Sequence, residues 1–171
     1  FNAPSELTTG QDAAIRIVDG PGIFNGSPTF TITGSLTIVR PTASEEWKAE
    51  SALNLSDSAI YVEWTPNGNM GALRLEFDPT GDFTGADLRT IASSLINNTN
   101  NGTSCTPSGG NGCYVLSGSE LPQADELTAG DTAKFRLTAA VPDPDIVSTV
   151  EPAFEVRGWY DLTAPINTDT W

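Results

Sequence analysis

The sequence predicts an all-β protein, an antiparallel jelly-roll-like β-sandwich with one inserted short helix. Three observations support this fold class. Charged residues make up only 18% of the 171 residues, so Thr, Ser, Asn and Gly carry the polar balance, and these types favour strands and turns. Short segments alternate apolar and polar residues, and turn signals separate them. We therefore expect an N-terminal tail over residues 1–10 and a single β-sandwich domain over residues 11–171.

The strands are predicted in order along the chain. Residues 13–18 alternate around Arg16 and end at the turn signal Asp19-Gly20-Pro21-Gly22. Residues 30–39 form a long half-buried strand pattern, with Gly34 as a bulge or bend. The Asn-Gly pair in residues 66–69 predicts a β-hairpin. Further strands are expected over residues 52–55, 59–64, 72–77, 114–116, 133–140 and 153–162.

One helix is predicted, over residues 85–96. Thr84 and Asp87 resemble a capping box at its start. The apolar residues that recur with a helical period are Leu88, Ile91, Ala92, Leu95 and Ile96. The polar run over residues 97–102 would end the helix and lead toward the cysteine loop.

Charge and composition exclude several classes of function. The chain carries 22 acidic against 8 basic residues, for a net charge of −14, and this charge repels phosphate backbones and anionic lipid headgroups. Without any His, it cannot build a His-based zinc site or a Ser-His-Asp triad. We expect no nucleic-acid partner and no enzymatic activity. A saline exterior would screen the acidic surface, although a surface kept soluble by self-repulsion explains the charge equally well.

Several features predict a secreted protein. Cys105 and Cys113 bracket a Pro- and Gly-containing loop that can bring the two sulfurs together, which predicts a disulfide. The apolar runs are too short to span a bilayer, and the sequence begins as a mature chain would after signal removal. Asn-X-Ser/Thr sequons, which are candidate glycosylation sites, begin at Asn25, Asn54, Asn97 and Asn101.

Acidic turns make calcium the candidate ligand, although no cofactor is expected to be required. Asp78 with Asp82, and Asp143 with Asp145, place two carboxylates on short turns. The alternative is that these residues simply form turns.

Aromatic residues offer a second class of function, a secreted carbohydrate-binding or adhesive module. The side chains that could stack on sugars are those of Trp47, Trp64, Trp159 and Tyr160. Aromatic residues on strands more often fill the core, so both roles remain open for these four residues.

Two stretches of the chain resemble a known family. Residues 127–138 contain an Ala-Gly-Asp turn that opens a strand, and residues 153–162 form a later strand. Residues 51–64 follow a strand, polar turn, strand pattern. Together they resemble the camelysin and TasA-type extracellular fibre proteins. The departures are the tail over residues 163–171 and the N-terminal residues, which do not match the family pattern.

The resemblance implies a secreted jelly-roll subunit that polymerises with copies of itself into extracellular filaments by donor-strand complementation. The candidate donor strand is the tail over residues 1–10. Phe1 and Leu7 have even spacing, so both would point to one face of an extended segment, with Ala3 between them. Trp171 at the other terminus is the next candidate for the subunit contact.

Overall fold

The protein is all-β in the computed structural model. The structure describes residues 12–14, 16–18, 24–26, 28–31, 34–54, 58–98, 101, 105, 107, 109–126, 132–139, 147–149 and 153–159. The strands are β1 (Asp12–Ala13), β2 (Arg16–Val18), β3 (Phe24–Gly26), β4 (Phe30–Thr31), β5 (Ser35–Arg40), β6 (Glu46–Lys48), β7 (Tyr61–Asn67), β8 (Ala72–Asp78), β9 (Arg89–Ile96), β10 (Gly112–Val115), β11 (Lys134–Ala139), β12 (Val147–Thr149) and β13 (Glu155–Arg157). Two single-turn 3₁₀ helices are also present, η1 (Gly118–Glu120) and η2 (Ala124–Glu126).

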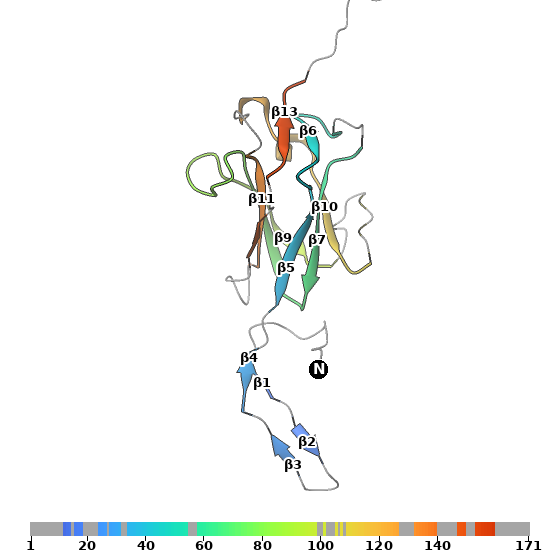
Figure 1. Cartoon of the computed structure of the whole chain (residues 1–171), viewed down its shortest axis with the longest axis vertical. Helices are drawn as coiled ribbons and strands as arrows, with labels where there is room; N and C mark the ends of the chain where they lie inside the picture. Colours follow the sequence, from blue (N-terminus) through green and yellow to red (C-terminus); the bar gives the residue numbers. More distant parts are fainter. Residues whose placement is uncertain are drawn as a thin grey trace, which may run out of the picture.

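Two antiparallel sheets share one hydrophobic core, and together with β6 and β13 they make up what we call the two-sheet body (Figure 1). One sheet has the strand order β10-β7-β5 and the other β12-β11-β8-β9. Leu73, Leu75 and Phe77 of β8 are buried in the same core cluster as Val62 and Trp64 of β7. Because alternate residues of both sheets face inward, each sheet covers the apolar face of the other.

An aromatic cluster fills one end of the core. The ring centroids of Trp47 and Phe154 lie 4.7 Å apart, and Phe135 lies 5.1 Å from Phe77 and 5.5 Å from Phe154. These distances fall in the range in which aromatic pairs add to the free energy of burial. Trp47 and Phe154 belong to the region where β6 pairs in parallel with β13, so the cluster joins this pair to the main sheets.

A half-buried carboxylate organises the turn between β5 and β6. Glu45 is ion-paired with Arg40 at 2.8 Å, and it accepts hydrogen bonds from Thr42 N and Trp47 Nε1. Burial alone would raise the pKa of Glu45, but these donors outweigh it and lower the pKa below its ordinary value. The charged form of Glu45 is therefore part of the folded structure.

The predicted helix over residues 85–96 is wrong, because the structure has strand β9 there. β9 pairs with β8 through two register shifts, between Leu73 and Leu75 and between Leu75 and Glu76. Each shift inserts an extra residue in β9 and changes the phase of its alternation. As a result the residues that contact the core, Ile91, Ala92 and Leu95, are spaced as on a helix.

The predicted hairpin at residues 66–69 is also wrong. The chain does turn there, with Gly68 and Gly71 at φ of 93° and 69°, but β7 and β8 belong to different sheets. A turn signal fixes local backbone conformation, whereas the strand partner is decided by which apolar faces cover each other. Most other predicted strands are confirmed in type, with residues 30–39 divided into β4 and β5 before and after Gly34.

The strands β1 to β4 form a separate antiparallel ribbon, which we call the arm (Figure 1). β1 pairs with β4 and β2 pairs with β3, and the partners shift by one residue between the two parts. In the view of Figure 1 the arm points away from the two-sheet body and continues into β5. Among the side chains that the structure describes, every member of the core cluster falls between Leu36 and Phe154, outside the arm.

Candidate assembly surface

The residues predicted to form the subunit contact lie outside the described part of the chain. These are Phe1, Ala3 and Leu7 of the tail, and Trp171. Their roles stay predictions. The described strands that could contact another chain are the edges of the two sheets.

The two sides of the body differ in how their edges meet. On one side β12 lies close to β5. On the other side β9 and β10 are the edges, and within the described residues neither strand pairs along its outer edge. Side chains rather than a ladder connect these two strands. β9 and β10 are therefore the edges most open to an added strand.

Asn101 connects one end of β9 to β10. Its side chain donates to the carbonyls of Ile96 and Cys113, at 3.1 and 3.2 Å, and accepts a hydrogen bond from Ile96 N at 2.5 Å. The amide thus takes the place of a strand residue at the end of β9. Nearby, Trp64 Nε1 donates to Asn97 O at 2.8 Å and links β7 to the same turn.

The disulfide predicted between Cys105 and Cys113 is confirmed, with the two Cα atoms 6.3 Å apart. It anchors the polar loop after β9 to β10. Gly112 beside it lies against the Trp64 indole, where a Cβ would come within 2.4 Å of ring atoms. Both features hold β10 tightly to the body.

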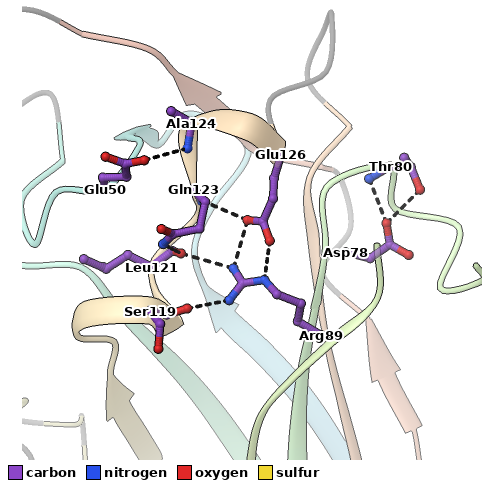
Figure 2. Close-up of polar contacts among 9 residues, drawn as sticks. All are labelled: Glu50, Asp78, Thr80, Arg89, Ser119, Leu121, Gln123, Ala124 and Glu126. Carbon is purple, nitrogen blue, oxygen red and sulfur yellow. Dashed lines mark hydrogen bonds and ion pairs between the residues drawn. The ribbon is translucent and has the colours of Figure 1, made fainter. Parts of the chain in front are cut away.

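At the start of β9, Arg89 binds the segment of η1 and η2 to this strand (Figure 2). Arg89 Nη1 donates to Ser119 O at 2.6 Å, and Nη2 donates to Leu121 O at 3.1 Å. The guanidinium also pairs with Glu126, with Nε 2.5 Å from Oε1. Carbonyl and carboxylate acceptors together compensate the partly buried cation, and Glu126 also accepts a hydrogen bond from Gln123 N.

Tyr114 of β10 is tied to the same segment. Its hydroxyl donates to Glu120 Oε1 at 2.5 Å. Burial and this carboxylate raise the pKa of Tyr114 to about 12. The phenol therefore remains protonated and holds β10 to η1 at every pH of ordinary use.

Two open cavities lie at the ends of β9. One, of about 550 Å³, is lined by Arg89, Thr90 and Ile91 together with Ser119 and Glu120. The other, of about 600 Å³, is lined at β9 by Ile96 and Asn97 and lies over residues 65–69 and 109–111. Ile96 is 57% exposed, which is unusual for a large aliphatic side chain on a strand. The outer edge of β9 thus runs between two recesses.

This surface lacks charge between its ends, where Arg89 begins β9 and lines one cavity together with Glu120. The sequence contains no Asp, Glu, Lys or Arg between Arg89 and Glu120, a stretch that includes β9, the cysteine loop and β10. In a chain of net charge −14 this is the part where another acidic molecule meets the least repulsion. The absence of charge is visible in the sequence, but its place on neighbouring sheet edges is not.

The predicted calcium ligands are only partly described. Asp78 is fully buried, and its Oδ1 accepts hydrogen bonds from Thr80 N and Thr80 Oγ1, both at 2.7 Å (Figure 2). The same oxygen accepts a hydrogen bond from Gly81 N at 2.9 Å. Its Oδ2 is buried without a hydrogen-bond partner. The Thr84 N–H lowers the pKa of Asp82. Asp143 and Asp145 lie outside the described residues.

No group of three or more acidic, Cys or His residues that could hold a metal ion occurs among the residues that the structure describes. The turn after β8 therefore offers two carboxylates, from Asp78 and Asp82, and any further ligands would be backbone or hydroxyl oxygens. Calcium accepts such oxygens. Calcium binding stays a prediction.

The four sequon asparagines differ in their burial and in the contacts of their side chains. Asn54 and Asn97 are each 7% exposed, and Asn97 Nδ2 donates to Gly68 O. Asn101 makes the strand-like hydrogen bonds described above. Asn25 lies on β3 of the arm. A glycan on Asn97 or Asn101 would have to displace these contacts, so among the sequons the arm position interferes least with the body.

The aromatic residues considered for sugar binding divide between core and surface. Trp47 and Trp64 are fully buried, so they cannot form part of a sugar platform, and their core role is confirmed. Trp159 is 43% exposed, with Lys48 Nζ 5.3 Å from its ring centroid. Tyr160 lies outside the described residues.

In comparisons with known proteins, no family model matches the chain, and no curated protein or solved structure matches it significantly. In the part of the chain that is described, no helix has the length and apolar character needed to cross a membrane. The disulfide and this finding are compatible with a secreted protein.

Proposed function

We propose that the protein is a non-enzymatic structural subunit of an extracellular filament, pilus-like or part of a biofilm fibre, that polymerises by donor-strand complementation. The observation that carries the proposal is the open outer edge of β9, with which no described strand pairs. An open edge presents unpaired N–H and C=O groups, and a strand from a second copy would satisfy them along a whole ladder. Head-to-tail addition that does not close produces a fibre.

The jelly-roll form of the two-sheet body is part of this proposal. The chain passes from one sheet to the other between β7 and β8, between β9 and β10, and between β10 and β11. Repeated crossing between two sheets around one core is typical of Greek-key and jelly-roll sandwiches. The resemblance of residues 51–64 and 127–162 to camelysin and TasA-type fibre proteins supports the same assignment.

Electron microscopy of the purified full-length chain tests the proposal. We expect filaments, with a salt dependence set by the net charge of −14: at about 1 M salt the Debye length falls to roughly 3 Å and subunit repulsion is screened. A monodisperse monomer at all salt concentrations would overturn the proposal. Retention of that monomer on a polysaccharide column would favour the carbohydrate-binding alternative, for which exposed Trp159 is the available aromatic contact.

A further inference from the structure

The arm has hydrogen bonds between its strands, and none of its described side chains belongs to the core cluster. β2 and β3 pair over three residues each, and β1 and β4 over two. Two-stranded ribbons are at best marginally stable in water unless a third strand or another surface packs on them. Phe30 of the arm is 41% exposed, and the described residues at positions 14, 26, 28 and 29 are also exposed. In the view of Figure 1 the body does not cover the arm.

The arm shares an unusual property with the β9–β10 surface. The sequence has no charged residue between Asp19 and Arg40, a stretch that includes β3, β4 and most of β5. It has none between Arg89 and Glu120 either. Two copies of a chain with net charge −14 repel each other most where their acidic surfaces face each other. The contact that reduces this repulsion joins the uncharged β3 and β4 of the arm in one copy to the uncharged part of β9, after Arg89, in the next. The charged residues Asp12 and Arg16 lie on β1 and β2.

The β9 edge has the form that such a contact needs. β9 is an eight-residue edge strand, long enough to pair with either strand of the arm. The cavities at its two ends leave room beside the edge for the side chains of an added strand. Exposed Ile96 would be covered by that strand. β10 is shorter, with four residues. Asn101 already bonds to its Cys113 carbonyl and also to the N–H and carbonyl of Ile96, so an added strand would pair with the part of β9 before Ile96.

We infer that the arm of one copy, β1 to β4, adds to the outer edge of β9 in a second copy, and that this is the donor–acceptor contact of the filament. The inference rests on the proposed function and names the two surfaces that it uses. It assigns the donor to residues 12–31 rather than to the tail over residues 1–10. The added strand would extend the four-stranded sheet and bring the apolar residues of the arm against Ile96.

Cysteine cross-linking tests the contact directly. The natural cysteines are joined in a disulfide, so each introduced cysteine is the one reactive thiol. Ala14→Cys or Thr29→Cys on the arm is mixed with Ser93→Cys on β9, and the matched control is Thr37→Cys on β5, which is exposed on an edge of the other sheet. Mild oxidation should give a mixed dimer with Ser93→Cys at least about tenfold above the Thr37→Cys control. Equal yields would overturn the acceptor assignment.

Truncation separates the arm from the tail. Removing residues 1–11 should leave filament formation unchanged, whereas removing residues 1–31 should abolish it. Because the core residues that the structure describes lie between Leu36 and Phe154, both truncated chains should keep the melting temperature of the full-length monomer. Filaments from the chain lacking residues 1–31, or loss of filaments in the chain lacking residues 1–11, would overturn the donor assignment.

The same experiments distinguish the inference from the proposed function. If the full-length chain forms no filaments, the proposed function fails and no donor is defined. If the full-length chain forms filaments and the arm-deleted chain does so too, the proposed function stands and the inference fails. Substituting Asn25→Asp and Thr29→Asp, which adds charge to the arm, should weaken assembly at low salt and restore it at high salt. An effect independent of salt would contradict the role of the uncharged surface.

Discussion

The arm and the two-sheet body are both made of antiparallel strands, yet they are stabilised differently. In the body, ladders carry side chains that meet in one core, where Trp47, Phe77, Phe135 and Phe154 pack together. In the arm every residue whose burial the structure describes is exposed, Phe30 among them. Backbone hydrogen bonds alone do not make a pair of strands stable in water, because most of the stabilisation comes from buried apolar surface. Mutations in the body should therefore change the stability of the monomer, whereas mutations in the arm should change its association with other copies.

The largest effect on stability is expected from deleting an aromatic ring in the core. Phe135→Ala removes a ring that contacts Trp47, Phe77 and Phe154, and should lower the free energy of unfolding by about 3–5 kcal/mol. The matched change in the arm, Phe30→Ala, should alter the unfolding of the monomer by less than about 0.5 kcal/mol. Urea denaturation under non-assembling conditions measures both. Similar losses for the two variants would show that the arm packs on its own body.

Removing the disulfide should have the next largest effect. Replacing Cys105 and Cys113 together by Ser should lower the free energy of unfolding by about 2–3 kcal/mol. The loss is modest because the disulfide closes a short loop and so removes little chain entropy from the unfolded state. Thermal unfolding of the double variant, and of the natural protein with and without a reductant, should give matching losses. A double variant as stable as the natural protein would mean that hydrogen bonds such as those of Asn101 already fix β10.

A comparison of glycines sharpens the contrast between body and arm. Gly112→Ala would place a Cβ 2.4 Å from Trp64 ring atoms, and should destabilise the body by about 1–3 kcal/mol. Gly26→Ala in the arm meets no heavy atom within 4 Å, and should be nearly neutral in the monomer. Denaturation curves and the near-ultraviolet signal of Trp64 provide the measurement. Equal tolerance at both positions would contradict the tight contact at Gly112.

Acidification should weaken the body through Glu45. Its folded-state pKa is lowered, so the stabilisation is fully present above its ordinary value of 4.5 and is lost as the pH falls through the folded-state pKa. Between pH 6 and pH 3 the natural protein should lose on the order of 1 kcal/mol more than Glu45→Gln. Denaturant titrations at the two pH values test this difference. Parallel losses would show that other carboxylates dominate acid unfolding.

The smallest expected effect is that of calcium on the turn after β8. Binding at a concentration equal to the dissociation constant stabilises by about 0.4 kcal/mol, or roughly 1 °C in melting temperature. Calorimetry with millimolar calcium against chelator, at matched ionic strength, should show this rise in the natural protein. Asp82→Asn, which neutralises the exposed carboxylate and keeps the Asp78 carboxylate, should abolish it. Coinciding midpoints in the natural protein would sink the prediction.

The sequence predicts the class of fold because alternation and turn residues are local properties. Strands β5, β7, β8 and β11 were all predicted from such patterns. It does not predict β9, because two bulges give Ile91, Ala92 and Leu95 a helical spacing. The roles of Arg89 and Asn101 depend on contacts with residues far along the chain or on the neighbouring sheet, and no local pattern encodes them. The absence of charge between Arg89 and Glu120 is visible in the sequence, but it indicates a surface only once β9 and β10 are known to be sheet edges.

The position of Asn101 also has a consequence for the chemical ageing of the protein. Asn101 precedes Gly102, the sequence context in which an asparagine amide most readily cyclises onto the next backbone nitrogen and deamidates. Here three hydrogen bonds hold the amide, and they must break before cyclisation. Deamidation would replace the Nδ2 donor of Asn101 by a carboxylate oxygen, which cannot donate a hydrogen bond. The carbonyls of Ile96 and Cys113 would then lose this donor. The folded state therefore delays the reaction, and the reaction would in turn weaken the hydrogen bonds that connect β9 to β10.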